Sequence, residues 1–233
     1  MPGAELDPSS LRIPPSNSRS TLSTDSFLTL AGRGEAETRV KASRFHAVAA
    51  PVLDSGEARA LLAERQRAAF DATHHCSAWR LRDGVWRAND AGEPSGSAGA
   101  PILAAIAGAD LQDCGVVVTR YYGGTKLGVG GLIRAYGEAA ALALEQAPRW
   151  RATPAMRLRV RYDYAHTAAV MRVLEKLGTQ EIEHGYAGEG ATGEVAFTLA
   201  VVERPALDEL LRDQTSGDLA AEVLEPRLIY TAR

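Results

Sequence analysis

The stretch Asn89–Ala141 constrains the fold of this chain more than any other part, because two glycine-rich loops interrupt it. These loops are Gly92–Gly99 (GEPSGSAG) and Gly123–Gly131 (GGTKLGVGG). Glycine loses more conformational freedom on folding than any other residue, so such loops are usually kept where the backbone turns sharply or approaches something closely. Between them, the apolar run Cys114–Tyr122 is typical of a strand buried on both faces of a sheet. We therefore expect both loops on one side of this sheet, forming a single binding surface.

Each loop runs directly into a predicted helix, Ala100–Ala107 after the first and Leu132–Leu144 after the second. A helix N-terminus presents free N–H groups and favours an anion, although such loops are also common as plain tight connections. Ser95 or Ser97 can cap the first helix, and Glu93 is the only carboxylate in its loop. The sequence therefore predicts an anion-binding surface at these helix starts.

Two nucleotide-binding motifs do not fit the second loop. A P-loop requires Gly before its Lys and Ser or Thr after it, but Lys126 stands between Thr125 and Leu127. The dinucleotide-binding fingerprint, started at Gly128, requires its third Gly where Ile133 stands. The sequence therefore supports neither a nucleotide triphosphatase of the P-loop class nor a Rossmann dehydrogenase.

The second loop is locally basic, although the whole chain, with a net charge of −3, is not a basic nucleic-acid binder. Lys126 stands out because the chain contains only three lysines. Tyr121 and Tyr122 lie beside the loop. Residues 115–137 contain no acidic residue and three basic ones, Arg120, Lys126 and Arg134. This stretch suits the phosphate or carboxylate groups of a nucleic acid, a nucleotide or an acidic peptide.

The overall composition is that of an ordinary globular protein. Of its 233 residues, 45% are apolar and 24% are charged, which is enough for one large or two small domains. No apolar run is long enough for a membrane helix, and the start lacks the apolar core of a secretory signal. Two cysteines, Cys76 and Cys114, fit a reducing cytoplasm and are too few for a thiolate zinc site. We expect a cytoplasmic protein that uses no membrane, metal or cofactor.

Ahead of the loops, the pattern predicts a tail, a strand and a helix. Residues 1–26 are rich in Ser and Pro and indicate a disordered or extended tail. Thr38–Pro51 alternates loosely and predicts a strand with a bulge near Ala42–Ser43, which places Lys41 and Arg44 near its middle. Asp54–Phe70 predicts a helix that Asp54 or Ser55 can cap.

Thr73–Leu81 and Val85–Ala88 predict a hairpin, whose first strand contains His74, His75 and Cys76. Adjacent residues of a strand point to opposite faces, so the two histidines cannot hold one ion from a regular strand. His74 and Cys76 share a face and can form a catalytic pair only if that face is exposed. Free cysteine mostly behaves as a small hydrophobe, so we interpret these residues as packing and hydrogen-bonding groups.

Beyond a linker expected at Arg149–Pro154, the pattern becomes βαββαβ, the order of a ferredoxin-like domain. Residues 151–233 contain 10 basic and 13 acidic residues and lack the basic-aromatic strands of an RNA recognition motif. This order predicts strands over 156–162, 179–186, 193–202 and 220–230, and helices over 165–178 and 205–216.

Five motifs between residues 28 and 148 resemble, in order, those of the YigZ/IMPACT family. They are KASRF (Lys41–Phe45), DATHHC (Asp71–Cys76), NDAGEPSGSAG (Asn89–Gly99), VVTRYYGGTKLG (Val117–Gly128) and GGLIRAY (Gly130–Tyr136). The chain departs from the usual pattern at Ser97, Tyr122 and Thr125, and none of these changes removes a charge or a glycine. DYAHT (Asp163–Thr167) and EHGY (Glu183–Tyr186) are similar to the extra domain of bacterial members.

The resemblance implies an α+β fold. Its N-terminal domain, expected at residues 27–150, would have the left-handed βαβ fold of domains in a ribosomal protein and elongation factor G. A ferredoxin-like domain is expected at residues 155–233. Eukaryotic members of the family act in translational control, and the family has no established catalytic residues to carry over.

Two functions follow from these observations. The first is a non-enzymatic, translation-associated regulator that binds RNA, the ribosome or a translation-factor protein. The alternative is an enzyme that acts on a small phosphorylated or carboxylated metabolite, with Glu93, His74 or Cys76 as acid, base or nucleophile. The residues expected at the binding surface are Lys41, Arg44, Glu93, Ser95, Ser97, Arg120, Tyr121, Tyr122, Gly123, Gly124, Lys126, Gly130 and Arg134.

Overall fold

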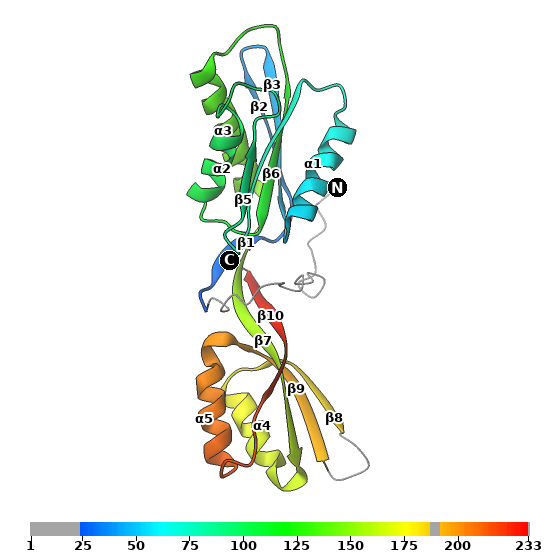
Figure 1. Ribbon diagram of the computed structural model, residues 1–233, viewed down its shortest axis with the longest axis vertical. Helices are drawn as coiled ribbons and strands as arrows, with labels where there is room; N and C mark the ends of the chain where they lie inside the picture. The colour runs from blue at the N-terminus through cyan, green and yellow to red at the C-terminus, as the bar shows by residue number, and fades with distance from the viewer. Residues whose placement is uncertain (1–23, 187–191, 233) are drawn as a thin grey trace. The chain divides into compact units, whose positions relative to one another are not determined.

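The computed structural model describes residues 24–186 and 192–232. The chain divides into two compact units, Phe27–Arg151 and Ala152–Tyr230. Each unit contains one antiparallel sheet with helices packed against it, so the predicted mixed α+β class is confirmed (Figure 1). The tail expected over residues 1–26 lies outside the described residues apart from residues 24–26. None of the helices within the described ranges is long and apolar enough to cross a membrane.

A five-stranded antiparallel sheet forms the centre of the first unit. Cys114–Tyr121 is its middle strand, and seven of its eight residues are buried, because both faces of the sheet are covered. This confirms the burial predicted from its continuous apolar run. The strands follow the order β2 (Gly34–Val40), β3 (Ser43–Pro51), β6 (Cys114–Tyr121), β4 (His74–Arg80) and β5 (Trp86–Asn89).

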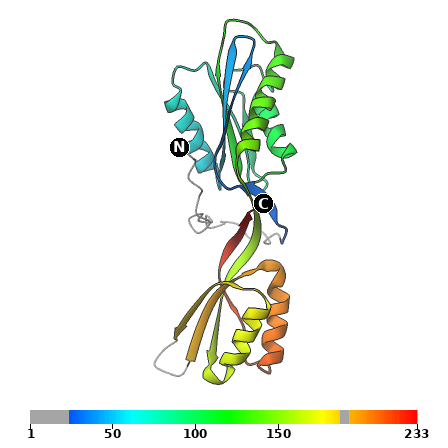
Figure 2. The same ribbon diagram turned by 180° about the vertical axis from the view of Figure 1, so that it is seen from behind.

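Helices cover the two faces of this sheet unequally. Helices α2 (Gly99–Gly108) and α3 (Val129–Gln146) lie side by side on one face, and α1 (Ser55–Ala68) lies on the other (Figures 1 and 2). Strand periodicity divides the core accordingly: Cys76 packs with α2 and α3, whereas Trp79 packs with α1. The short strand β1 (Phe27–Leu30) adds a bridge between Leu28 and Leu111.

Three local predictions in the first unit need correction. Thr38–Pro51 is not one bulged strand: β2 and β3 form a hairpin, and Lys41 lies in its turn with a φ of 53°. Helix α3 begins at Val129 rather than at Leu132, so Gly130 and Gly131 belong to its first turn. The linker expected at Arg149–Pro154 is instead the start of the strand β7 (Arg149–Asp163), whose alternating residues are buried. Alternating burial supports a strand here because one face of the sheet is covered.

The second unit has the predicted βαββαβ order. Its sheet runs β10 (Glu222–Ala232), β7, β9 (Thr192–Ala200) and β8 (Gln180–Tyr186), which brings the first and third strands together at the centre. Helices α4 (Thr167–Lys176) and α5 (Arg204–Gln214) cover one face, and Leu158, Phe197 and Leu207 are fully buried in the core that they form with the sheet. The elements after β7 are η2 (Tyr164–His166), α4 (Thr167–Lys176), β8 (Gln180–Tyr186), β9 (Thr192–Ala200), η3 (Val201–Glu203), α5 (Arg204–Gln214) and β10 (Glu222–Ala232).

Cross-strand ion pairs occupy the opposite face of this second sheet. Arg157, Arg159 and Arg161 alternate with the buried residues of β7, so they all project to that face. Arg159 contacts Glu222 at 2.9 Å, and Arg161 contacts Glu194 at 2.8 Å. Since its arginines are paired with carboxylates, this face does not present free positive charge to a phosphate.

Candidate functional site

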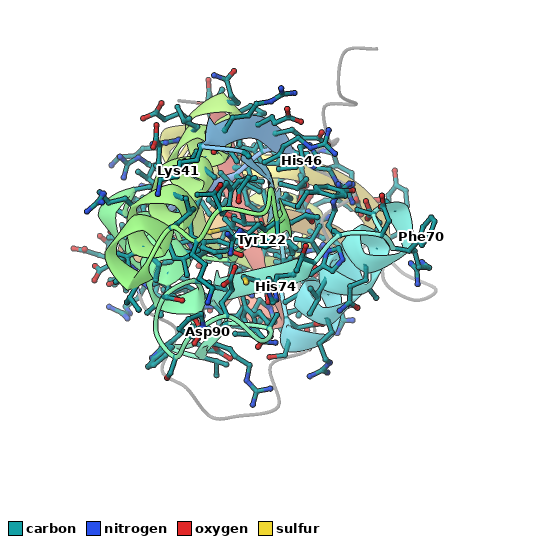
Figure 3. The ribbon with its side chains drawn as sticks, turned by 90° about the horizontal axis from the view of Figure 1, so that it is seen from above. Lys41, His46, Phe70, His74, Asp90 and Tyr122 are labelled. Atoms are coloured by element: carbon teal, nitrogen blue, oxygen red, sulfur yellow. The ribbon has the colours of Figure 1, made fainter. Side chains whose placement is uncertain are left out.

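The two glycine-rich loops meet at one end of the first sheet, on the side of α2 and α3. His74 Nδ1 lies 2.8 Å from the carbonyl oxygen of Ala91, and Arg120 at the end of β6 contacts Glu93 of the first loop at 2.7 Å. Figure 3 views this end of the unit, with Tyr122 and His74 near its centre and Asp90 beside them. The contact of Glu93 with Arg120 places the first loop beside the end of β6, the strand that leads into the second loop.

The N-terminus of α2 is already occupied by a carboxylate of the chain itself. Asp90 accepts hydrogen bonds from the backbone N–H groups of Gly96 (2.8 Å), Ala98 (2.9 Å) and Gly99 (2.8 Å). Burial alone would raise the pKa of the Asp90 carboxyl, but these three N–H groups lower it below its ordinary value. The first loop is thus folded around an internal anion rather than open to an external one.

The two serines of this loop therefore do not have the predicted capping role. Ser97 is fully buried, and its hydroxyl donates to the carbonyl oxygen of Pro94 at 2.6 Å. Ser95 is exposed. The N-cap residue of α2, Ala98, has no side chain that can cap, and the N–H of Gly99 is bonded instead to Asp90, nine residues earlier in the chain. Asp90 supersedes a local serine cap because it reaches three N–H groups at once.

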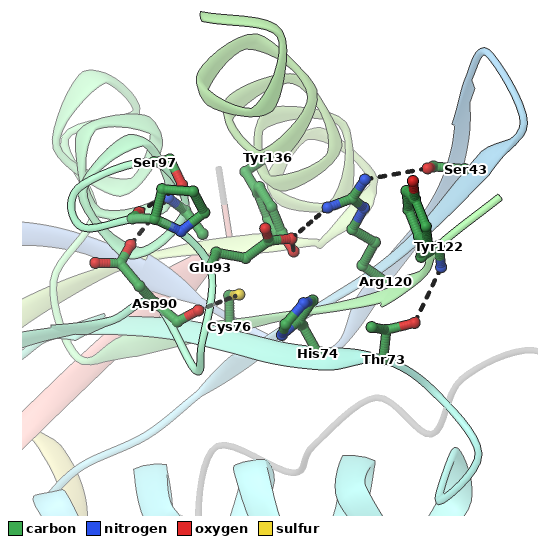
Figure 4. Close-up of polar contacts among 12 residues, drawn as sticks. Ser43, Thr73, His74, Cys76, Asp90, Glu93, Ser97, Arg120, Tyr122 and Tyr136 are labelled. Atoms are coloured by element: carbon green, nitrogen blue, oxygen red, sulfur yellow. Dashed lines mark hydrogen bonds and ion pairs between the residues drawn. The ribbon is translucent and has the colours of Figure 1, made fainter. Parts of the chain in front are cut away.

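Arg120 is an internal cation and not part of the exposed basic surface. Its side chain is 6% exposed, and that of Glu93 is 4% exposed. A charge buried this deeply must be paired, which Glu93 achieves at 2.7 Å while also accepting the Tyr136 hydroxyl at 2.7 Å. Arg120 also donates to the Ser43 hydroxyl at 3.2 Å (Figure 4). Arg120 and Glu93 thus join β3, β6, α3 and the first loop, and neither charge is free for a ligand.

Two aromatic rings flank this ion pair. The Cζ atom of Arg120 lies 5.4 Å from the ring centre of Phe45 and 5.3 Å from that of Tyr122. Phe45 in turn meets the ring of Tyr136 edge to face at 5.1 Å. Burial is the main cause that raises the pKa of the Tyr136 hydroxyl above its ordinary range, so this group donates to Glu93 as a neutral phenol. Tyr122 is the member of this cluster that reaches solvent, with 45% of its surface exposed.

The histidine and cysteine of β4 have structural partners. Cys76 is fully buried, and its thiol donates to the carbonyl oxygen of Asp90 at 3.0 Å. Burial is the main cause that raises the pKa of this thiol to about 12, which keeps it protonated at neutral pH. His74 holds the first loop through Ala91. No cluster of three or more potential metal ligands occurs within the ranges that the structure describes.

Arg44 and Tyr121 are predicted site residues that lie on the other face of the sheet. They are opposite each other in the pairing of β3 with β6, and the Arg44 Cζ atom lies 4.4 Å from the Tyr121 ring centre. The Tyr121 hydroxyl donates to Asp71 at 3.3 Å. Tyr121 follows Arg120 directly in the strand, so the two side chains project to opposite faces. The structure does not bring Arg44 and Tyr121 to the surface formed by the two loops.

The exposed part of the site surrounds the start of α3. Lys41, Lys126 and Arg134 are all exposed there, and Lys41 Nζ donates to the carbonyl oxygen of Lys126 at 3.3 Å, which holds the two lysines together. Gly128 caps α3 with a φ of 72°, and no side chain in the described part of the chain bonds to its first N–H groups. We call this set the α3 surface: Lys41, Tyr122, Gly124, Lys126, the N-terminus of α3 with Gly130, and Arg134.

Gly123 fixes how closely the loop approaches the hairpin. A Cβ atom at this position would lie 1.9 Å from the carbonyl oxygen of Ala42, so no other residue fits without a shift of the backbone. Gly124 has a φ of 82° and open space around it. These two glycines therefore serve the close approach and the turn that the sequence predicted.

Sequence reasoning missed the central roles of Asp90, Phe45 and Tyr136. Asp90 stands nine residues before Gly99, too far for the short-range spacing by which helix caps are recognised. Phe45 and Tyr136 belong to the strand and helix core, and nothing local in the sequence shows that they enclose Arg120. The one available signal was chemical: an arginine inside an apolar strand requires a partner carboxylate, and Glu93 is the only one in the first loop.

Comparison with known proteins gives a consistent assignment. The sequence model of the Impact N-terminal domain matches residues 41–144. The IMPACT family member in the pol 5′ region of Thermus thermophilus is 37% identical over 183 residues, covering 78% of this chain and 99% of that protein. Escherichia coli YigZ is 36% identical over 172 residues, covering 72% of this chain and 80% of that protein. Bacillus subtilis YvyE is 44% identical over 115 residues, but the match spans only 53% of its length.

A solved structure has a similar fold. The crystal structure of a hypothetical protein aligns with a TM-score of 0.60 at 29% identity, covering 86% of this chain and 98% of that chain. The matches to the Thermus thermophilus and Escherichia coli relatives cover most of the length of those proteins, so the similarity is not confined to one motif. The motif resemblance is thus confirmed, and the chain belongs to the IMPACT family.

Proposed function

We propose that this chain is a translation-associated regulator that binds RNA through the α3 surface. The translation-related part of this proposal rests on membership of the IMPACT family. The RNA-binding part rests on the chemistry of the surface: Lys41, Lys126 and Arg134 are exposed cations, and residues 115–137 contain no acidic residue. Contacts of this kind to phosphates provide most of the affinity in sequence-independent nucleic-acid binding.

The contrast between two helix starts carries this proposal. In α2 the N–H groups of the N-cap residue Ala98 and of the first residue Gly99 are bonded to Asp90. In α3 no side chain of the described residues bonds to the first N–H groups. An unoccupied helix N-terminus flanked by lysine favours a phosphate, because its N–H groups and dipole both attract negative charge.

The alternative is catalysis on a small phosphorylated metabolite at the same surface. The three groups considered for acid, base or nucleophile chemistry have other partners: Cys76 is buried, Glu93 is paired with Arg120, and His74 contacts Ala91. A ligand at the α3 surface would meet phosphate-binding groups, whereas Cys76 is buried, Glu93 is paired and one ring nitrogen of His74 contacts Ala91. These contacts support binding over catalysis.

RNA affinity as a function of salt tests the proposal. Fluorescence anisotropy of labelled oligouridylate measures the dissociation constant of the wild type and of Lys126→Ala/Arg134→Ala at several salt concentrations. Each phosphate contact to a single strand contributes about 0.7 to the slope of log affinity against log salt. Loss of two contacts should therefore lower that slope by about 1.4 and weaken binding.

A matched control is available in the other unit. Arg172→Ala/Lys176→Ala removes one lysine and one arginine that are exposed on α4, so net charge changes equally. This control should bind RNA like the wild type. Equal binding by all three proteins, or no binding by any, would contradict the proposal. A thermal shift with one phosphorylated metabolite, together with no RNA binding, would favour the enzymatic alternative.

A further inference from the structure

Tyr122 presents an aromatic ring at the α3 surface that phosphate binding does not require. The ring is 45% exposed, although a tyrosine in a strand–loop junction beside a buried cluster would gain by packing inward. The guanidinium of Arg120 lies over this ring, with Cζ 5.3 Å from the centre, so one side of the ring is in contact with protein. The residue nevertheless keeps almost half of its surface exposed, and Tyr122 lies near the centre of the end view in Figure 3.

The backbone that carries this ring is fixed on both sides. The N–H of Tyr122 donates to Thr73 Oγ1 at 3.1 Å (Figure 4). The N–H of Gly123 donates to Ser43 Oγ at 3.3 Å. Gly123 also lies against the carbonyl group of Ala42, where no Cβ atom fits. A ligand that stacks on a ring held in this way loses little affinity to ordering the protein.

The ion pair beneath the ring holds the guanidinium in place. Glu93 and Ser43 bind two nitrogens of Arg120, whose side chain is almost completely buried. The Nε atom of Arg120 is buried without a hydrogen-bond partner among the described residues. Thus a guanidinium group with one N–H donor left without a partner lies beneath the partly exposed ring of Tyr122. Stacking and cation–π contacts of this kind are typical of sites that hold single-stranded nucleic acid.

We propose that Tyr122 is a stacking platform for an unpaired base of single-stranded RNA, whose phosphates lie on Lys41, Lys126 and the N-terminus of α3. This inference rests on the proposed function and adds the class of RNA. Bases in a duplex are covered by their neighbours and cannot lie flat on an exposed ring, so the platform selects unpaired segments. Every base has a π face, so the platform binds unpaired segments without preference for their sequence.

Base dependence of binding separates this inference from simple phosphate binding. The probes are labelled oligouridylate, an abasic ribose-phosphate oligomer of the same length and a duplex of the same length. The variant Tyr122→Leu keeps an apolar cover over Arg120 but has no flat ring, and Tyr122→Phe keeps the ring. Tyr164→Leu replaces another exposed tyrosine, in the second unit, and serves as the control.

Stacking on one aromatic side chain changes affinity by about 5- to 150-fold on alanine substitution. We therefore expect Tyr122→Leu to weaken oligouridylate binding within that range and to leave binding of the abasic oligomer unchanged. Tyr122→Phe and Tyr164→Leu should bind like the wild type. Unchanged circular dichroism and thermal midpoint of Tyr122→Leu would show that the loss is local.

Tyr122→Trp provides a readout that does not depend on a destabilising change. Its added indole fluorescence should be quenched by oligouridylate and not by the abasic oligomer. If Tyr122→Leu binds oligouridylate as well as the wild type, or if base and abasic probes bind equally, the platform is refuted. The proposed function would still stand in that case if Lys126→Ala/Arg134→Ala lost affinity, so the two failures are distinguishable.

Discussion

The buried pair of Arg120 and Glu93 gives the most demanding test of this structure. The free energy of unfolding lost when one partner is removed should depend on how deeply the pair is buried, not on the distance between its atoms. Both side chains are below 10% exposed and meet at 2.7 Å. Removal of one partner from a buried ion pair leaves the other charge uncompensated, which costs about 3–5 kcal/mol. We expect Arg120→Met and Glu93→Gln each to lower the free energy of unfolding of the first unit by about this amount.

The double variant should lose much less than the sum of the two single variants. In Arg120→Met/Glu93→Gln neither charge of the pair remains, so the main penalty of each single variant disappears. Some loss stays, because the Ser43 hydroxyl loses one partner and the Tyr136 hydroxyl exchanges a charged acceptor for a neutral amide, each worth about 1 kcal/mol. A coupling energy of at least about 2 kcal/mol follows, well above the roughly 0.5 kcal/mol within which independent sites add.

Urea unfolding followed by tryptophan fluorescence measures this effect in the right part of the molecule. Trp79, Trp86 and Trp150 are the three tryptophans of the chain, and all lie within the first unit. Trp79 and Trp86 lie in β4 and β5 of the first sheet, so the signal reports mainly the unit that contains the ion pair.

The Arg33–Glu64 pair provides the matched control in the same unit. Its atoms approach to 2.5 Å, closer than those of Arg120 and Glu93, but its side chains are 49% and 39% exposed. Glu64→Gln should therefore cost only about 0.2–1 kcal/mol. Equal losses for Glu64→Gln and Glu93→Gln, or additive losses in the Arg120 and Glu93 cycle, would refute the argument from burial.

Two further predictions concern the first unit. Asp113 is 2% exposed, and burial raises the pKa of its carboxyl to about 6 from 3.8. The folded state thus binds this proton more tightly than the unfolded state, so stability from this group is full below about pH 4 and is lost as pH rises to about 6. Asp113→Asn keeps the oxygen that accepts the Arg82 N–H. In urea titrations this variant should be more stable than the wild type by about 3 kcal/mol at pH 8, and the gain should disappear near pH 4. A gain that is independent of pH would contradict this. Gly123→Ala should cost about 3 kcal/mol, because its Cβ would lie 1.9 Å from a backbone oxygen. Gly124→Ala should cost only about 1–2 kcal/mol for its positive φ, and a reversed order in the same titration would show that the loop does not approach the hairpin as described.

Sequence periodicity predicted strands well wherever the spacing of apolar residues matches the faces of the sheet that are covered. The run Cys114–Tyr122 is buried on both faces, and Met156–Tyr162 alternates, because the pattern of apolar residues matches the covered faces of each sheet. The bulge near Ala42–Ser43 was wrong because a two-residue hairpin turn and a bulge both interrupt alternation, and Lys41 is not a residue that indicates a positive φ.

The site was less predictable because its chemistry depends on distant partners. Local sequence placed Arg120, Lys126 and Arg134 together as one cationic group. Only the fold shows that Arg120 is neutralised by Glu93, 27 residues away, while Lys41 joins Lys126 across 85 residues. Spacing rules reach about one helical turn or one strand pair, so they could not assign these contacts.

Arg120 is buried and is not one of the exposed cations, which strengthens the case for a specific surface. Exposed cations alone would attract any polyanion, and their effect would be screened by salt beyond about 10 Å. The structure places Arg120 apart from the exposed cations, beneath Tyr122, where it is shielded from solvent and its position is fixed by Glu93. Charge held there cannot contact a phosphate, but it can strengthen stacking on the ring above it. The proposed platform would distinguish an unpaired base from a bare polyphosphate, whereas Lys41, Lys126 and Arg134 alone would bind both.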